Sequence, residues 1–224
     1  MCSCRGVSKV RQGLYGGAVL GCGNQKCVFT NFPGVPADEV TAIFQYAMPN
    51  DPLALREYNV ETNPALLEIL NRIDPTNERF VYAIVMDIAP TPIATLPEET
   101  RNDIARAQEG LPVTNLSELS IFKQKRVQTI PKNDSINELQ KEYLRDSVAI
   151  LHANGIAHGD IHPGNIGIYN GNIVLIDFGK AIVRGDRDYE TAIKFDNKML
   201  MEDYFRKSAK KRYRADSFDS AYGK

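Results

Sequence analysis

Hydrophobic and polar positions change period several times along the chain, and the clearest change lies in its second half. Two strand-length apolar runs, Ile166 to Tyr169 and Asn172 to Ile176, are joined by Asn170-Gly171. Asn-Gly is the favoured pair for a two-residue type I′ turn, so this segment predicts a β-hairpin. The hairpin would bring the residue before its first strand, Asn165, back beside the residue after its second strand, Asp177.

Helical periodicity surrounds the hairpin. Ser135-Ile136-Asn137-Glu138 has the form of a capping box, and a helix is predicted from there to Gly155. Its buried face is expected to contain Leu139, Tyr143, Val148 and Leu151. A further helix is predicted from Tyr189 to Lys207, on the other side of the hairpin.

The first half of the chain shows weaker patterns. Residues 51–73 are predicted to be helical, because Asn63-Pro64 provides a cap and a first-turn proline before an apolar face. That face contains Leu66, Ile69, Leu70 and Ile73. Strands are predicted at Val40 to Gln45 and at Phe80 to Ala89. Residues 90–134 are predicted to be an insertion with one short helix, from Pro97 to Gln108.

Composition narrows the class of protein without identifying it. The 224 residues can bury a substantial core, and the net charge of -1 gives no general attraction to nucleic acid or anionic membranes. No run approaches the roughly 18 apolar residues of a membrane span. The four cysteines lie near the start without the spacing of a disulfide framework, so reduced thiols are expected. We expect a soluble cytoplasmic protein, a class that includes viral or bacterial proteins acting in a host cytosol.

Two carboxylates, Asp160 and Asp177, flank the hairpin, and Asn165 follows the first of them by five residues. Phosphoryl transfer from ATP needs this set of groups. One carboxylate orients the attacking hydroxyl and accepts its proton, while an amide oxygen and a second carboxylate hold magnesium ions. The spacing therefore predicts ATP and Mg²⁺ as the cofactors of a phosphotransferase.

The sequence HGDIHPGN at residues 158–165, followed by IDFG, resembles the catalytic and metal-binding loops of the protein-kinase-like superfamily. The motif HGDIHPGN is closer to that of aminoglycoside and choline phosphotransferases and of atypical kinases than to that of ordinary protein kinases. The resemblance implies an α+β, two-lobed fold with a small β-rich N-lobe and a minimal helical C-lobe. It implies that Asp160 is the catalytic base, that Asn165 and Asp177 bind magnesium, and that Gly179 is a flexible joint.

Two other residues of the motif differ from the protein-kinase pattern. Gly159 replaces the arginine that normally receives an activation-loop phosphate, so the resemblance implies no regulation by that phosphorylation. His162 stands where protein kinases carry a lysine near the transferred phosphate. It is therefore a candidate for contact with the nucleotide.

The glycine-rich segment 11–29 is the candidate phosphate-binding loop, and two registers compete. In the first register, Gly21, Gly23 and Val28 follow the kinase pattern GxGxxGxV. Lys26 then replaces the third glycine of that pattern.

In the second register, Gly13 and Gly16 of Gly-Leu-Tyr-Gly resemble the GxYG loop of some kinases from large DNA viruses. Gly21 to Phe29 would then lie on the strand that follows the loop. Neither glycine cluster is specific by itself, and the two registers remain open.

The largest departure from the superfamily lies in the strand predicted at Val40 to Gln45, which contains no lysine to hold the α- and β-phosphates. By resemblance to with-no-lysine kinases, Lys26 can reach the same phosphates from the glycine-rich loop. The alternative is that the anchor is lost and the protein is a pseudokinase. A glutamate normally pairs with the lysine, and Glu57 is our choice over Glu61 and Glu68.

The segment Phe80 to Ala89 matches the strand that leads into the kinase hinge. By resemblance, Met86 is the gatekeeper, and backbone groups of Asp87 and Ala89 bind adenine. We expect one kinase-like domain over residues 1–224, with an N-lobe at about 10–89, an insertion at about 90–134 and a C-lobe at about 135–207.

The favoured function is a Ser/Thr protein kinase with an unidentified protein substrate. A small-molecule kinase of the aminoglycoside or choline type is the second hypothesis, although the 45 residues after Gly179 leave little room for the helical lobe of those enzymes. A pseudokinase binding module is the third. The chain is expected to end in a basic tail at 208–224. The positive residues lie at 206–214, and this segment is either a solvated end or a docking site for an acidic partner or nucleic acid.

Overall fold

The computed structural model describes residues 19–22, 26–44, 63–86, 88–107, 113–119, 121–130 and 136–201. The chain forms two compact units. Unit 1 consists of Met1–Leu55 and Ile84–Arg126, and unit 2 consists of Arg56–Ala83 and Val127–Lys224. This division differs from the expected one, because residues 56–83 belong with the second half of the chain and most of the expected insertion belongs to unit 1.

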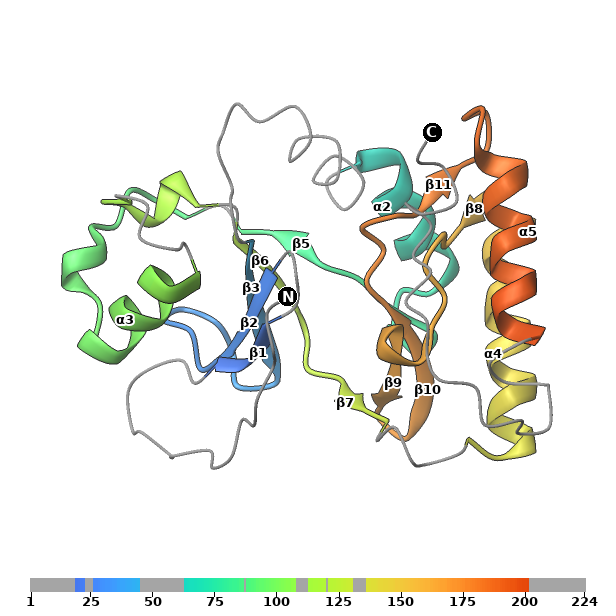
Figure 1. Cartoon of the computed structure of the whole chain (residues 1–224), viewed down its shortest axis with the longest axis horizontal. Helices are drawn as coiled ribbons and strands as arrows, with labels where there is room; N and C mark the ends of the chain where they lie inside the picture. Colours follow the sequence, from blue (N-terminus) through green and yellow to red (C-terminus); the bar gives the residue numbers. More distant parts are fainter. Residues whose placement is uncertain are drawn as a thin grey trace, which may run out of the picture. The chain divides into compact units, whose positions relative to one another are not determined.

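Unit 1 contains a five-stranded antiparallel sheet in the order β1-β2-β3-β6-β5 (Figure 1). Its strands are β1 (Val19–Cys22), β2 (Lys26–Thr30), β3 (Glu39–Phe44), β5 (Ile84–Val85) and β6 (Ile121–Lys125). The strand predicted at Val40 to Gln45 is thus formed as β3. Its pairing on both sides makes β3 the central strand of the sheet.

The insertion supplies part of the core of unit 1. It contains η1 (Ile93–Thr95), α3 (Glu98–Ala107) and η2 (Leu116–Glu118), and α3 confirms the helix predicted from Pro97 to Gln108. Ile104 of α3 is buried in one cluster with Phe29 of β2 and Ile43 of β3. The insertion is therefore part of the packed unit, because it covers one face of the sheet.

The prediction of one strand from Phe80 to Ala89 is wrong. The segment is divided between β4 (Phe80–Val81), which pairs with a strand of unit 2, and β5, the edge strand of the sheet in unit 1. Residues 84–126 all belong to unit 1, so the chain passes on to unit 2 after β6 and not after Ala89. The sequence pattern failed here because an apolar run does not reveal which sheet each half joins.

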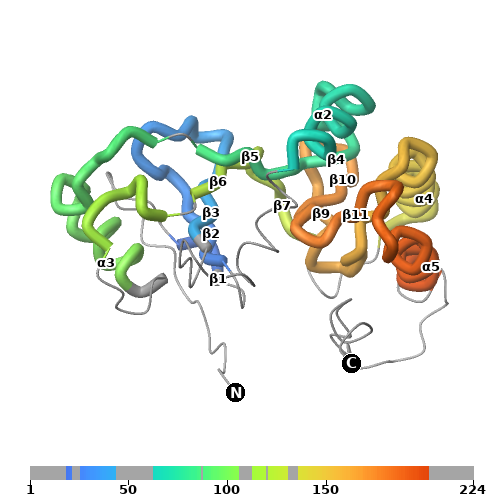
Figure 2. The backbone as a smooth tube through the Cα atoms, turned by 90° about the horizontal axis from the view of Figure 1, so that it is seen from above, coloured from blue at the N-terminus to red at the C-terminus, as the bar shows by residue number. Residues whose placement is uncertain are grey.

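Unit 2 contains a four-stranded sheet in the order β4-β10-β9-β7 and a two-stranded sheet of β8 and β11. Their further strands are β7 (Gln128–Thr129), β8 (Ile156–Ala157), β9 (Ile166–Tyr169), β10 (Asn172–Ile176) and β11 (Ile182–Val183). The helices are α2 (Pro64–Ile73), α4 (Glu138–Ala153), α5 (Tyr189–Met199) and the short η3 (Pro163–Asn165). Figure 2 shows α4 and α5 next to each other in this unit.

Helix ends in unit 2 follow local capping chemistry. The Asn63 side chain accepts a hydrogen bond from Ala65 N at the start of α2, as predicted. At α4 the capping box is formed by Asn137 and Gln140, two residues later than predicted. This shift places Leu139 on the solvent side with 77% exposure, so its predicted burial is wrong.

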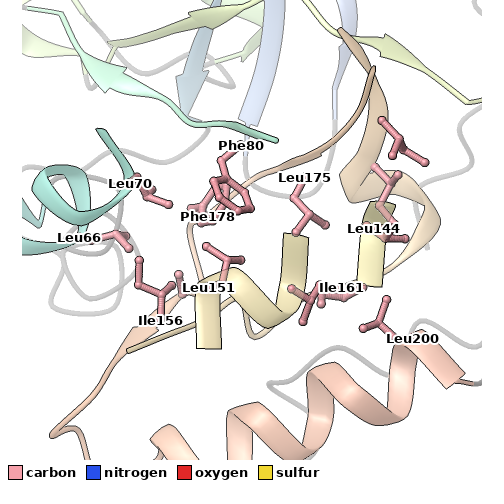
Figure 3. Close-up of a cluster of buried hydrophobic side chains, with 14 of the residues drawn as sticks. Leu66, Leu70, Phe80, Leu144, Leu151, Ile156, Ile161, Leu175, Phe178 and Leu200 are labelled. Atoms are coloured by element: carbon pink, nitrogen blue, oxygen red, sulfur yellow. The ribbon is translucent and has the colours of Figure 1, made fainter. Parts of the chain in front are cut away.

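One hydrophobic cluster holds unit 2 together. Leu66 and Leu70 of α2 pack with Leu144, Val148 and Leu151 of α4, while the hairpin and the segment after it contribute further side chains (Figure 3). Those further residues include Ile166, Ile173, Leu175 and Phe178. All are nearly or fully buried, so the hairpin is fixed to the helices by its apolar side chains.

Two observations bear on the class of protein. No helix in the described ranges is long and apolar enough to cross a membrane. Cys27 is disulfide-bonded, which corrects the expectation that the cysteines are reduced. Its Cα partner across the β1–β2 ladder is Cys22.

Candidate active site

The β9–β10 hairpin forms as the sequence predicts. Asn170 and Gly171 both have positive φ, 49° and 83°, as a type I′ turn requires. The register pairs Ile166 with Leu175 at the open end of the hairpin. Asn165 and Asp177, which lie just outside this end, are therefore held at neighbouring strand termini.

Asp160 lies at the centre of a group of polar side chains in unit 2. The amide Nδ2 of Asn165 donates to the backbone oxygen of Asp160 at 3.0 Å and to its Oδ2 at 3.3 Å. His162 Nε2 lies 3.7 Å from the same Oδ2, and Lys180 Nζ lies 3.8 Å from it. Three groups that can donate hydrogen bonds thus surround one carboxylate oxygen.

These neighbours keep Asp160 in its charged form. Burial would raise the pKa of the carboxyl, but interaction with His162 and the positive charge of Lys180 outweigh it and hold the pKa below its ordinary value. The ring of His162 is oriented because its Nδ1 accepts a hydrogen bond from Gly164 N at 3.0 Å. Its Nε2 therefore carries a proton toward the carboxylate.

The loop after β10 has a special backbone conformation. Asp177 has a φ of 65°, in the left-handed region that aspartate tolerates better than most residues. The next residue, Phe178, is fully buried and packs against His158 at 4.8 Å and Phe80 at 6.1 Å between ring centroids. This anchor fixes the position of Asp177 although the hairpin has already ended.

A buried carboxylate on α5 holds the start of the predicted catalytic loop, residues 158–165. Asp196 has no exposed surface and accepts hydrogen bonds from His158 N at 2.7 Å and Gly159 N at 2.9 Å. Its Oδ2 also lies 3.1 Å from Nε2 of His152 on α4. A carboxylate with two backbone donors on one segment fixes that segment strongly.

Gly159 is required by its surroundings. Its φ is 77°, and a Cβ at this position would overlap the backbone oxygen of Lys180. The catalytic loop and the segment after Phe178 therefore touch through their backbones. No larger residue fits here without displacing one of the two segments.

In unit 1, one face of the sheet groups two residues of the predicted nucleotide site, Lys26 and Val28. Antiparallel pairing places Lys26 opposite Phe44 and Val28 opposite Ala42. Directly opposed residues share a face, which is here the reverse of the face that buries Phe29 and Ile43. Phe44 stands where the kinase pattern VAIK has its lysine, so Lys26 is the cross-strand neighbour of that position.

The strands also bear on the two glycine registers. Gly21 to Phe29 does not form one strand, because β1 ends at Cys22 and β2 begins at Lys26. A strand, a short connection and a second antiparallel strand are the arrangement that the first register needs. Both registers stay predictions, because Gly13, Gly16 and Gly23 lie outside the described residues.

Several predicted residues are not brought into either group. Glu57, Gly13, Gly16, Asp87 and the basic segment 206–214 lie outside the described residues. Glu68 is exposed on α2, as expected from its position opposite the apolar face. Met86 and Ala89 lie between β5 and η1 within unit 1, a few residues after the chain enters this unit at Ile84, and their hinge role stays a prediction.

The donor set fits magnesium bound together with phosphates. Among the described residues no group of three or more His, Cys, Asp or Glu side chains could hold a metal ion alone. Mg²⁺ in nucleotide sites typically uses one or two protein oxygens, substrate phosphates and water. Asn165 suits this role because its Nδ2 is turned toward Asp160, which leaves the amide oxygen as its acceptor.

Comparison with known proteins agrees with this geometry. Residues 110–218, just under half of the chain, match the RIO domain family, and this segment contains the whole catalytic loop, the hairpin and α5. This match supports the assignment of the segment to the protein-kinase-like superfamily, as the motif predicts. Its mixed architecture, with a β-rich unit 1, agrees with the kinase-like fold expected from the motif.

Solved structures and curated proteins add little to this assignment. A structure described as the CAK complex from Chaetomium thermophilum bound to ATP-gamma-S is similar over 77% of this chain and 49% of that one. The present chain thus spans about half the length of the chain that it matches. The identity is 15% and the TM-score is 0.48. No curated protein matches the sequence.

Sequence reasoning missed two residues of the kinase-like site. Lys180 follows Asp-Phe-Gly directly, and its adjacency to the motif was the available signal. Asp196 had a weaker signal, because Ala192, Asp196 and Leu200 recur every four residues and all are buried. A charged residue within an apolar helical stripe indicates a buried partner.

Proposed function

We propose that the chain is an ATP-dependent protein kinase that transfers the γ-phosphate of ATP to a serine or threonine hydroxyl. The observation that carries this proposal is the surroundings of Asp160. An ionised carboxylate, held by Asn165 and facing His162 and Lys180, lies in a loop that Asp196 and Phe178 fix from two sides.

In this mechanism, Asp160 orients the acceptor hydroxyl and takes its proton. Asn165 and Asp177 would hold Mg²⁺, which would neutralise the charge of the phosphates. The fixed loop contributes by positioning, since a preorganised base and metal site need no rearrangement at the moment of transfer.

The nucleotide side of the proposal uses unit 1. Lys26 is the candidate for holding the α- and β-phosphates, with Glu57 as its proposed partner, and Val28 and Ala42 are candidates for contact with adenine. Their shared face on the β2–β3 pair supports this assignment. Backbone groups of Asp87 and Ala89 remain the candidates for binding adenine, because the chain enters unit 1 at Ile84, a few residues before them.

A protein acceptor is favoured over a small molecule by the match to the RIO domain, an atypical protein kinase family. A radiolabel from [γ-³²P]ATP should therefore appear in the protein fraction when a panel of generic protein substrates is offered. If aminoglycosides or choline are offered and the label appears only in the small-molecule fraction, the acceptor is a small molecule and not a protein. A cytoplasmic location and an acidic partner for the basic segment 206–214 remain proposals.

The first prediction concerns the base. Asp160→Ala should lower phosphate transfer by roughly 10²- to 10⁴-fold, the usual contribution of a general base, while nucleotide affinity changes little. Asp146→Ala, at an exposed position of α4, is the matched control and should keep full activity. Full activity of Asp160→Ala would refute the mechanism, and a wild-type protein that binds no nucleotide would indicate a pseudokinase module.

A further inference from the structure

Lys180 is a mostly buried cation beside the proposed base. Its Nζ lies 3.8 Å from Asp160 Oδ2, and both side chains keep 17% of their surface exposed. The backbone of Lys180 is fixed, because its carbonyl oxygen lies against Gly159 and the next residue, Ala181, donates to Phe178 O at 3.0 Å. The ammonium group is thus presented to the site from a rigid turn.

The contact with Asp160 is an ion contact and not a hydrogen bond. A distance of 3.8 Å exceeds the 2.7–2.9 Å of a charge-assisted hydrogen bond. A lysine ammonium on a four-carbon stem can change partners within several ångströms without any backbone movement. The observed position is therefore one from which the ammonium can move to a more highly charged group.

Such a group is expected at this place. If the proposed function is correct, the terminal phosphate lies between the metal ligands and the base, in a site that is already partly desolvated. A phosphate with its developing charge attracts an ammonium more strongly than a single carboxylate does, and positive groups at this point lower the barrier to transfer. Loss of the ammonium from Asp160 also removes one of the three donor groups around Oδ2, which makes the oxygen more accessible to the acceptor hydroxyl.

We propose that Lys180 is a catalytic residue whose ammonium moves from Asp160 to the terminal phosphate of ATP. This inference rests on the proposed function, because it assumes that ATP binds at this site. It assigns to the residue after Asp-Phe-Gly two effects: neutralisation of the transferred group and release of the base. Both effects depend on the third phosphate, which ADP lacks.

The test compares two nucleotides by calorimetry on the full-length protein with Mg²⁺. Wild type is expected to bind the non-hydrolysable analogue AMP-PNP more tightly than ADP. Lys180→Met should lose about tenfold in affinity for AMP-PNP, the scale of one charge-assisted contact, with little change for ADP. Lys180→Arg should recover part of the preference, and Lys194→Met, at an exposed position of α5, should behave as wild type.

The outcomes separate this inference from the proposed function. An equal loss for both nucleotides, or an unchanged preference for AMP-PNP in a Lys180→Met protein with wild-type thermal stability, would overturn the role of Lys180 alone. A wild-type protein that binds neither nucleotide would overturn the proposed function as well. Transfer rates supply a second readout, since Lys180→Met should lower kcat more than it raises the KM for the acceptor.

Discussion

Gly159→Ala tests whether the two backbone segments of the site support each other. Alanine at a φ of 77° costs about 1–2 kcal/mol for the left-handed conformation alone. The new Cβ would also overlap the carbonyl oxygen of Lys180, and overpacking in a fixed region costs a further ~1–3 kcal/mol. We expect a total loss of about 2–5 kcal/mol in the free energy of unfolding.

Gly171→Ala is the matched control for this prediction. Gly171 has a φ of 83°, close to that of Gly159, but nothing lies within 4 Å of the position of its Cβ. It should therefore show the conformational cost without the overlap. Urea denaturation followed by circular dichroism gives both values, and the phosphate-transfer rate gives the functional effect.

The difference between the two variants isolates the overlap with Lys180. Gly159→Ala should be the less stable by more than about 1 kcal/mol and should lose most of its transfer activity, because the Lys180 segment must move. Gly171→Ala should keep near wild-type activity. Equal stabilities within about 0.5 kcal/mol, with equal activities, would show that the two segments do not constrain each other.

Two further predictions concern buried carboxylates. Asp196→Asn should lower the free energy of unfolding by about 3 kcal/mol and reduce kcat. The asparagine amide has a single acceptor oxygen, so its NH₂ group cannot accept the second of the two hydrogen bonds from His158 N and Gly159 N. Unchanged stability in urea melts would contradict this prediction. Asp74→Ala should lower the free energy of unfolding by a similar amount, because Asp74 accepts hydrogen bonds from the backbone N–H groups of Glu78, Arg79 and Phe80. These bonds lie at the entry to β4, away from residues 158–165, so no selective effect on kcat is expected. A loss of kcat in Asp74→Ala with intact stability would show that this assignment is wrong.

Local signals explain what the sequence could predict. The hairpin formed as expected because Asn170-Gly171 has a conformational requirement that few other pairs meet, and α2 began at Asn63-Pro64 for the same kind of reason. The start of α4 was displaced because two capping pairs overlap in sequence. Asn137 and Gln140 formed the reciprocal hydrogen bonds of the box, and Ser135 lies outside the described residues.

Non-local pairing explains what the sequence could not predict. The run from Phe80 to Ala89 has the apolar character of one strand, but its halves pair with β10 and β6 in different sheets. Asp196 contacts backbone atoms 37 and 38 residues earlier, and no spacing rule reaches that far. The roles of Met86, Asp87 and Ala89 were assigned from the same run, and they stay predictions.

Gly159, which stands where the kinase motif usually has an arginine, has a structural role of its own. Asp196 holds Gly159 by its backbone N–H, and the absence of a side chain at Gly159 lets the carbonyl of Lys180 approach the loop. That approach in turn sets the starting point from which the Lys180 ammonium reaches Asp160. A side chain at position 159 would therefore disturb the surroundings of Asp160 through Lys180. The glycine and the lysine after Asp-Phe-Gly form one packing unit, and a change at either position should alter the charge around Asp160.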